Sequence, residues 1–357
     1  MGHDRLTADA LQAVEPRYAR SEAMLERALR TIPLGAQTFS KSLTQFPRGA
    51  APFFASRAKG ATLWDVDGNP YTDFVNALCS VTLGYGDPDV DAAVERQLKD
   101  GVIFSLSHAL EALLDGLKGE VAAVILEPMN VREPSPGYLE GVKRLAHAAG
   151  AVLIFDETIT GFRYARGGAQ ELFGVTPDLC TLGKGLANGF PLSAVCGRAD
   201  LMALMEEVFF SFTMGGECLS LAAADAALAK LEREPVVETL AQRGREVLAG
   251  TQALIDRQGL GEVLTLSGHP AWSFLAIKDR PQADAFTLKT LFMQEVLARG
   301  VLAYGTHNMS YAHGDAEVAA LLAAYDATFA VMAEALSDGD VLARLRCEPL
   351  KPLFKVR

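Results

Sequence analysis

The 357-residue sequence lacks an excess of positive charge and lacks long hydrophobic runs. It carries 33 Lys and Arg against 44 Asp and Glu, a formal net charge of -11 at pH 7. Without a basic cluster, a surface for nucleic acid or for an anionic membrane is not expected. The apolar runs "VAAVIL" and "AVLIF" are far shorter than the roughly 20 residues that a membrane-spanning helix needs. The sequence therefore predicts a protein without a membrane segment.

Cysteine is also scarce, and the sequence contains no CxxC pair. The odd count of five and the length of the chain favour reduced thiols over a disulfide framework. We expect Cys180 and Cys218 to act as small buried hydrophobic residues. The first 30 residues mix charges throughout and lack the apolar core of a secretory signal. Together these observations predict a cytoplasmic location.

The middle of the chain predicts an α/β fold. "EVAAVILEP" and "AVLIFDE" are typical of buried strands, and the amphipathic helix "PGYLEGVKRLAHAAG" lies between them. Two further short strands are expected in "PDLCTLGK" and "PLSAVCGR". Strands joined through a helix indicate a mainly parallel sheet with helices on both faces. Ligand-binding groups gather at the carboxyl ends of such strands.

Other segments surround this expected sheet. We expect a helix over residues 8–30, a hairpin turning at Asp67-Gly68-Asn69, and a helix that begins after Asp87 and ends at Gly101. The chain is largely helical over 202–258, and strands and two long helices follow it. The predicted domains are a segment 1–60 that joins the small domain, a large domain 61–245, and a small α+β domain 246–357.

Asp156 and Lys184 are the residues that point most clearly to chemistry. Asp156 ends a buried strand, and Lys184 stands between two glycines. A lysine in such a place is often a solvated turn, and a Walker-type phosphate loop fails because position 178 is Asp and position 185 is Gly. A lysine amine can form a Schiff base with an aldehyde, and a carboxylate can keep a pyridine nitrogen protonated. These are the two main demands of pyridoxal phosphate.

Six motifs then occur in the order found in a known family. They are "LWDVDGNPYTDF", "LGYGDPDV", "VAAVILEPMN", "LIFDETITGFR", "PDLCTLGKGLANGFPLSAVCGR" and "FSFTMGG". The chain resembles class III aminotransferases, and most of all enzymes of the glutamate-1-semialdehyde 2,1-aminomutase type. The resemblance implies a fold-type I, pyridoxal-phosphate-dependent enzyme that acts on a small amino or carbonyl substrate. It also implies a homodimer with active sites at the subunit interface.

The resemblance assigns roles to four residues. Lys184 would hold the cofactor as a Schiff base and shuttle a proton, and Asp156 would pair with the pyridine nitrogen. Glu127, in "LEP", would line the cofactor pocket, or be a structural acid at a strand end. Thr213, in "SFTMGG", would reach the cofactor phosphate from the neighbouring subunit, or be a turn hydroxyl. No metal site is expected.

The sequence departs from the family near Glu111 and Ala112. Family members carry a long segment there, which holds a phosphate-binding loop and an aromatic residue that stacks on the cofactor. Either the protein has lost this segment, or a mobile active-site segment is missing from the chain as written. A true loss would weaken cofactor anchoring, so a non-catalytic or merely cofactor-binding member of the fold is the alternative interpretation.

A second departure concerns the substrate. Lys41 stands where aminomutases use an arginine on the substrate carboxylate, and it keeps the charge but loses the two-pronged geometry. The choice between aminomutase and aminotransferase therefore stays open. His307 and Asn308, followed by His313, lie in "YGTHNMSYAH" and are candidates for the substrate side, with loop or core roles as the alternative.

Overall fold

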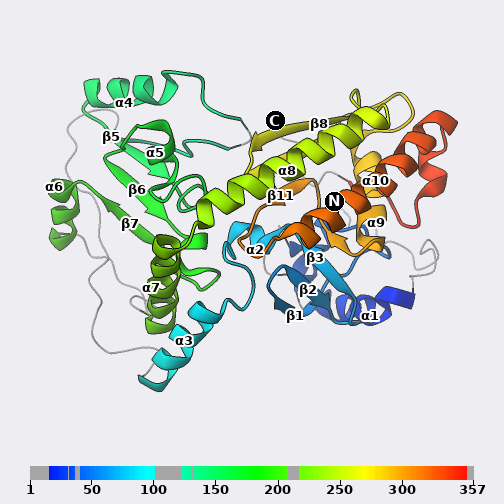
Figure 1. Ribbon diagram of the computed structural model, residues 1–357, viewed down its shortest axis with the longest axis horizontal. Helices are drawn as coiled ribbons and strands as arrows, with labels where there is room; N and C mark the ends of the chain where they lie inside the picture. The colour runs from blue at the N-terminus through cyan, green and yellow to red at the C-terminus, as the bar shows by residue number, and fades with distance from the viewer. Residues whose placement is uncertain are drawn as a thin grey trace.

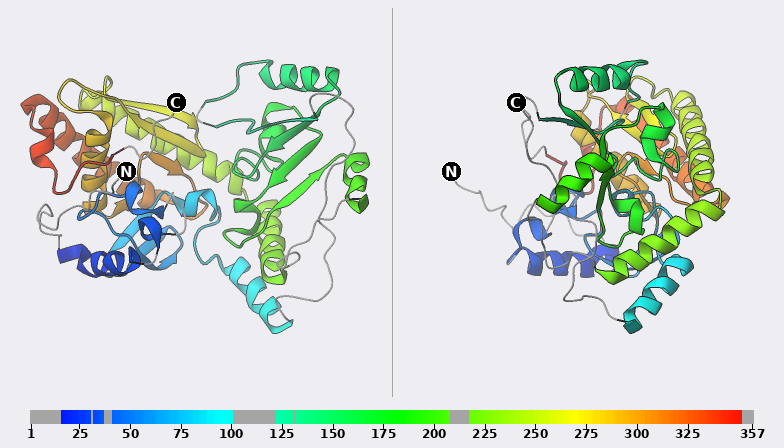
Figure 2. Two further views of the ribbon diagram at one scale, coloured as in Figure 1. Left: turned by 180° about the vertical axis from the view of Figure 1, so that it is seen from behind. Right: turned by 90° about the vertical axis from the view of Figure 1, so that its left-hand side faces the viewer.

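The computed structural model describes residues 16–30, 32–36, 41–100, 122–130, 132–207 and 217–351. Two lobes stand side by side, one holding the central segments and the other combining the N-terminal and C-terminal segments (Figure 1). The view from behind shows the same division (Figure 2). The α/β architecture expected from the sequence is confirmed.

The large lobe is built on a four-stranded sheet with the order β4-β5-β6-β7. Its strands are β4 (Ala123–Leu126), β5 (Val152–Asp156), β6 (Leu179–Leu182) and β7 (Ala194–Gly197). β4, β5 and β6 are parallel, whereas β7 pairs with β6 in the antiparallel sense. The helix α4 (Tyr138–Ala148) connects β4 to β5 and packs on β5, so the crossover read from the sequence is correct.

The small lobe holds two sheets. The hairpin of β2 (Thr62–Asp65) and β3 (Pro70–Asp73) is the one predicted from the sequence. β3 also pairs with β10 (Val301–Leu302), more than 200 residues away. The other strands of the lobe are β1 (Ala55–Lys59), β8 (Leu264–His269), β9 (Trp272–Ile277) and β11 (Thr306–Asn308). In this structure β2 and β3 thus share a sheet with the C-terminal region, and the expected domain limits stay a prediction.

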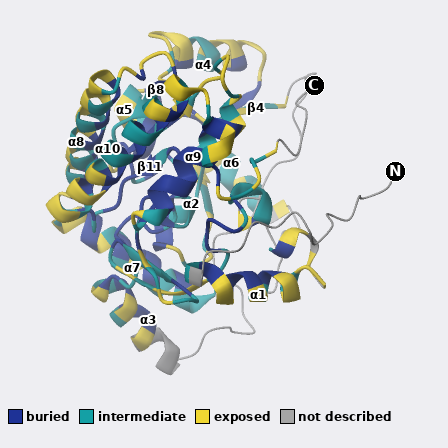
Figure 3. Ribbon diagram, turned by 90° about the vertical axis from the view of Figure 1, so that its right-hand side faces the viewer, coloured by how far each residue is buried: buried dark blue, intermediate teal, exposed yellow. Residues whose placement is uncertain are grey.

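Two helices fill the core of the small lobe. They are α9 (Ala285–Ala298) and α10 (Asp315–Asp338). α9 is buried along almost its whole length and is dark blue in Figure 3. α10 is long and apolar enough to cross a membrane by length and composition alone, but it packs against α8 (Val236–Arg257) and α9. We therefore interpret α10 as a core helix.

Three helices link the lobes. α3 (Pro88–Asp100) packs along α7 (Cys218–Arg233), and α8 then runs from the large lobe across the small one (Figure 1). Asp87 is the expected N-cap of α3, since its Oδ1 accepts from the amides of Asp89 and Val90 at 3.1 and 3.3 Å. Its Oδ2 accepts from Lys230 Nζ of α7 at 2.8 Å. The other helices are α1 (Ala19–Ala28), α2 (Asn76–Cys79), α5 (Gly168–Phe173) and α6 (Ala199–Met202).

Candidate active site

The carboxyl ends of β4, β5 and β6 meet at one edge of the large-lobe sheet. Leu126 of β4 pairs with Phe155 of β5, and Asp156 pairs with Thr181 of β6. Glu127, Asp156 and Lys184 therefore follow or end three neighbouring parallel strands. This edge is where open α/β sheets bind their ligands. The structure thus brings together three of the residues that the sequence singled out.

Asp156 is half-buried and is held by its neighbours on the sheet edge. Its Oδ1 accepts from the amide of Thr158 and from the hydroxyl of Thr181, both at 3.0 Å. Burial alone would raise the pKa of Asp156. The hydrogen bonds from Thr158 and Thr181 and the positive charge of Lys184 outweigh burial and lower the pKa below its ordinary value. Asp156 is therefore a carboxylate at neutral pH, as an acid facing a pyridinium must be.

Lys184 begins a short 3-10 helix directly after β6 and has a positive φ of 45°. The glycines on either side of it allow close packing. A Cβ on Gly185 would lie 2.7 Å from Thr82 Oγ1, and one on Gly183 would lie 3.2 Å from Thr158 Cγ2. The Lys184 charge acts on Asp156 and also on the Cys79 thiol. These close contacts explain why Lys184 stands between two glycines.

Glu127 is exposed at the end of β4, and its Oε2 accepts from Asn130 Nδ2 at 2.6 Å. Burial is the largest cause that raises the pKa of Tyr164, and it keeps the phenol neutral. The charge of Glu127 is one of the smaller causes, which indicates that Tyr164 lies near the same edge. Thr213 lies outside the described residues. Its expected contact with the cofactor phosphate stays a prediction.

Lys41 lies at a cavity of about 450 Å³ in the small lobe. Lys41 is exposed, and Arg57 adds a second cationic side chain to the lining. Most of the remaining wall is apolar or aromatic, including Phe46, Tyr85 and Tyr304. The cavity therefore suits a molecule with an apolar body and an anionic end.

A left-handed turn, Asn76–Cys79, lies between this cavity and Lys184. Its four residues have φ values of 47°, 47°, 59° and 70°, a conformation that costs energy in non-glycine residues. Asp73 Oδ1 stabilises its entry by accepting from the amides of Val75 and Asn76 at 2.7 and 3.1 Å. Ala77 and Leu78 of the turn line the cavity. Burial raises the pKa of the Cys79 thiol, and the positive charges of Arg163 and Lys184 oppose that rise. Sequence analysis missed this turn, for which the asparagine was the one available signal.

His307 and Asn308 lie behind the turn, in the core of the small lobe. His307 Nδ1 lies 2.9 Å from Ser273 Oγ, and His307 Nε2 lies 2.9 Å from Tyr325 Oη, so both ring nitrogens have partners. Burial lowers the pKa of His307 to about 4 and keeps the ring neutral. Asn308 Nδ2 donates to the carbonyl of Val75 at 2.7 Å. The structure therefore gives both residues packing contacts and does not group them with Lys184.

His313 has a similar place. Its Nε2 donates to the carbonyl of Asp73 at 3.0 Å, and its ring stacks on Phe74 with a centroid distance of 4.2 Å. Burial lowers its pKa to about 4. Within the described residues, no group of three or more His, Cys, Asp or Glu side chains is arranged for a metal ion.

Two further residues of "FDETITGFR" support the edge without having been recognised in the sequence. Glu157 is fully buried and accepts from the amides of Ala169 and Gln170 at the start of α5, both at 2.8 Å. The buried guanidinium of Arg163 donates to the carbonyls of Ala271, Met309 and Cys79 at 3.1, 2.9 and 3.2 Å. Bonds to backbone carbonyls of distant segments leave no local pattern in a sequence. Arg163 thereby joins the large lobe, the left-handed turn and the small lobe.

These side chains fit two of the groups that pyridoxal phosphate presents. An amine emerges from the end of β6, and an ionised carboxylate with ordered hydrogen bonds ends β5 beside it. The first matches the cofactor aldehyde and the second matches a protonated ring nitrogen. The arrangement agrees with the chemistry expected from the sequence.

Comparison with known proteins identifies the family. The family model described as aminotransferase class-III matches residues 45–109 and 103–313. The 3-aminobutyryl-CoA aminotransferase of Cloacimonas acidaminovorans (strain Evry) is 27% identical over 395 residues, covering 85% of this chain and 95% of that protein. The glutamate-1-semialdehyde 2,1-aminomutase of Symbiobacterium thermophilum is 32% identical over 327 residues, covering 63% of this chain and 75% of that protein.

The solved structures support the fold. The structure described as the PLP internal aldimine form of the Sphingopyxis sp. MTA144 FumI protein superposes with a TM-score of 0.79 at 23% identity. It covers 92% of this chain and 98% of that one. The expected fold-type I architecture is confirmed.

The family model matches in two stretches that overlap over residues 103–109. This is close to Glu111 and Ala112, where the sequence departs from the family, although those two residues lie outside the described part of the chain. The named relatives are enzymes, so the alternative of a non-catalytic member is not favoured. The chain belongs to the class III aminotransferase family, and the predicted family, enzyme class and pyridoxal phosphate cofactor are confirmed at that level.

Proposed function

We propose that this chain moves amino groups between small amino and carbonyl compounds with Lys184 and Asp156 as its central residues. The observation that carries the proposal is their placement at the ends of adjacent strands, with Asp156 kept ionised by Thr158, Thr181 and Lys184. Pyridoxal phosphate, when bound, supplies an aldehyde that takes up an amino group and a ring that withdraws electrons.

Asp156 acts by electrostatics. Its carboxylate would pair with the ring nitrogen of the bound cofactor and favour a proton there, because a negative charge in a half-buried site stabilises a protonated pyridine. Both hydrogen bonds, from Thr158 and Thr181, reach Oδ1 and fix the orientation of the group.

Lys184 has two tasks. Its Nζ would hold the cofactor covalently through the cofactor's aldehyde. As a free amine it would move a proton to and from the amino-bearing carbon of the substrate, which is general acid–base catalysis. The short helix that starts at Lys184 and the packing of Gly185 on Thr82 hold the base of this side chain in place.

The carboxylate end of the substrate reaches the cavity bounded by Lys41 and the left-handed turn, with its amino-bearing carbon towards Lys184. Lys41 pairs with a carboxylate of the substrate, while Phe46 and Tyr304 contact its carbon skeleton. A single cation there binds a carboxylate without imposing two-pronged geometry.

The family resemblance implies a dimer, whereas the cytoplasmic location was predicted from the composition of the sequence. We infer that two copies form a dimer in which Thr213 of one copy contributes to the phosphate site of the other, and that the enzyme works in the cytoplasm. Light scattering of the purified protein tests the dimer. A monomer that binds the cofactor and turns over substrate would contradict shared active sites.

The roles of Asp156 and Lys184 are tested by spectra of the purified protein loaded with pyridoxal phosphate. Lys184→Ala removes the covalent link and lowers activity about 10²–10⁴-fold. Asp156→Asn keeps the shape of the side chain but shifts the visible absorption of the bound cofactor and lowers turnover about 10²–10³-fold.

Asp178→Asn is the matched control. Asp178 lies at the opposite end of the same sheet, where it accepts from the amide of Leu153 at 2.8 Å and pairs with Arg198. The same chemical change there alters stability and leaves the cofactor spectrum unchanged. Equal spectral shifts in both variants would overturn the role of Asp156.

A further inference from the structure

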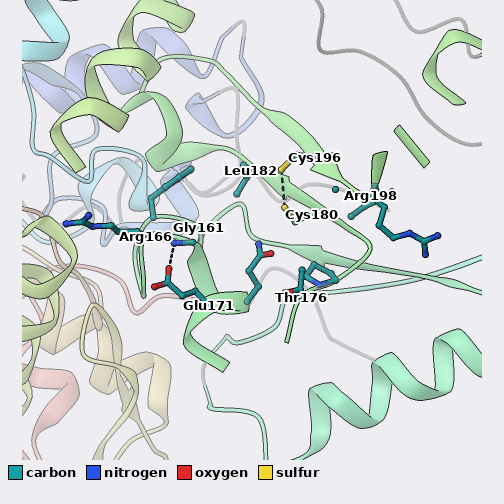
Figure 4. Close-up of a pocket in the computed structure, with 14 residues that line it drawn as sticks. Gly161, Arg166, Glu171, Thr176, Cys180, Leu182, Cys196 and Arg198 are labelled. Carbon is teal, nitrogen blue, oxygen red and sulfur yellow. Dashed lines mark hydrogen bonds between the residues drawn. The ribbon is translucent and has the colours of Figure 1, made fainter. Parts of the chain in front are cut away.

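A second cavity lies in the large lobe, away from the edge that carries Lys184. It has a volume of about 620 Å³ and lies between α5 and strands β6 and β7. Figure 4 shows Cys180 and Cys196 facing each other in its wall, with Arg166 and Arg198 on either side. None of the roles described above uses either cysteine.

The two thiols belong to directly paired residues of antiparallel strands. Cys180 of β6 is in register with Cys196 of β7, and their sulfur atoms lie 3.3 Å apart. Cα atoms of paired residues in an antiparallel ladder are about 4.5–5.5 Å apart, which lies within the range that a disulfide spans. A bond between them therefore needs only a small movement of the side chains.

The two thiols differ in their surroundings. Cys180 is 6% exposed and packs into the core of the large lobe with Leu153 and Phe155. Cys196 is exposed in the cavity. A hydrogen bond from Cys180 lowers the pKa of Cys196 to about 7 against the opposing effect of burial, so Cys196 has thiolate character near neutral pH. Cys196 is therefore placed to react first, and Cys180 is placed to bond to it afterwards.

The sheet separates this pair from the cofactor edge. Thr181, beside Cys180 in the chain, donates to Asp156, and alternate residues of a strand point to opposite faces. Cys180 accordingly packs with Phe155 on one face, whereas Thr181 and Asp156 lie on the other. The dithiol is a site of its own.

We propose that Cys180 and Cys196 form a reversible oxidation site that hydrogen peroxide converts to a cross-strand disulfide. The Cys196 thiolate attacks the peroxide, forming an S–O bond as the O–O bond breaks, and the departing oxygen leaves as water after taking a proton. The Cys180 sulfur then attacks the oxidised sulfur, forming the S–S bond and releasing a second water. Two thiols lose two electrons and two protons, and one hydrogen peroxide becomes two waters.

The sequence makes the product easy to detect. Trypsin cuts after Arg166, Lys184 and Arg198, so the two cysteines fall on separate peptides, 167–184 and 185–198. The full chain is treated with about one equivalent of hydrogen peroxide, its remaining thiols are alkylated, and the digest is analysed by mass spectrometry. The expected result is one linked pair of these two peptides that separates on reduction. Before oxidation, Cys196 is alkylated roughly tenfold faster than Cys218.

Single variants assign the order of events. Cys180→Ser leaves a sulfenic acid on Cys196 that dimedone traps, Cys196→Ser leaves Cys180 reduced, and Cys218→Ser behaves as the unchanged chain. A linked pair that involves any other cysteine overturns the proposal. So does oxidation of Cys196 beyond the sulfenic acid in the unchanged chain with no linked peptide. The spectrum of the cofactor is not used, so failure here is distinguishable from failure of the proposed function.

Discussion

The two lobes differ sharply in how completely their apolar residues are covered. In the small lobe, α9 and α10 bury Leu291, Phe292 and Phe329 fully. In the large lobe, a smaller core of described residues lies around Leu153 and Phe155, while Leu186 and Ala187, which follow Lys184, belong to the larger core. On the side of the smaller core, β4 leaves Ile125 62% exposed and α4 leaves Leu145 61% exposed. The part of the sheet that ends at Asp156 thus has the sparser cover.

Local stability is therefore expected to be lower around β4, β5 and α4 than in the helical core of the small lobe. Residues that bind cofactors are commonly drawn from regions of lower local stability. A ligand that binds the native state stabilises it, so cofactor binding is expected to protect the large lobe more than the small one.

The first prediction compares one phenylalanine from each core. Phe329→Ala and Phe155→Ala each remove a fully buried ring and cost about 3–5 kcal/mol locally. Hydrogen exchange distinguishes them. Phe155→Ala speeds hydrogen exchange in β4–β7 and leaves α9 and α10 protected. Phe329→Ala instead speeds hydrogen exchange in α9 and α10. Uniform loss of protection in both variants would show that the two lobes unfold as one unit.

The second prediction concerns the ion pair that fastens α3 to α7. Lys230 and Asp87 are nearly buried and lie 2.8 Å apart, so Lys230→Ala leaves a buried carboxylate without its partner. The expected loss is about 3 kcal/mol in the free energy of unfolding, measured by denaturant titration. Lys278→Ala, at an exposed position just after β9, is the control and should change stability by less than about 0.5 kcal/mol. A similar small change at Lys230 would contradict this account of the α3–α7 contact.

The third prediction uses pH to probe the small lobe. Unfolded His307 has an ordinary pKa of 6.5, whereas burial lowers the folded value to about 4. Between these values the unfolded state binds more protons, so stability falls as pH falls from 6.5 towards 4. The expected loss from this residue is about 3 kcal/mol. His307→Gln should remove this residue's share of the dependence and leave the share of His313, whose pKa is also about 4. An unchanged slope would contradict the prediction.

The fourth prediction addresses the exposed edge of the large lobe. Ile125→Thr on β4 should change the free energy of unfolding by less than about 0.5 kcal/mol, because the side chain is already in water. Leu291→Thr in α9 is the matched change in the small lobe, and chemical denaturation should show a loss of at least about 2 kcal/mol. Equal losses would mean that Ile125 is covered in solution.

Much of the architecture could be predicted because it depends on local patterns. The hairpin around Gly68, the N-cap at Asp87 and the parallel strands ending at Asp156 follow from turn chemistry, capping and apolar runs. The lysine between glycines likewise pointed to one edge of the sheet. Each of these signals lies within a few residues of the feature that it predicts.

The rest depends on contacts between segments far apart in the chain. The left-handed turn at Asn76 is stabilised by Asp73 and packs beside β11, and Arg163 bonds to carbonyls more than 80 residues away. The pairing of Cys180 with Cys196 depends on strand register, which two short strands do not fix by sequence alone. No residue pattern indicates which backbone carbonyl will accept a hydrogen bond or which register two strands will take. Such features are therefore visible only in the structure.

The most direct test of the account is the site at which borohydride fixes pyridoxal phosphate to the chain. Reduction of the loaded protein should attach the cofactor irreversibly to Lys184, which prevents trypsin from cutting after this residue. The digest should then contain one peptide of residues 167–198 that carries the cofactor. Asp156→Asn should still be labelled at Lys184, and Lys184→Ala should not be labelled. Cofactor fixed to another lysine, or 167–184 and 185–198 released unmodified, would contradict the assignment of the active site.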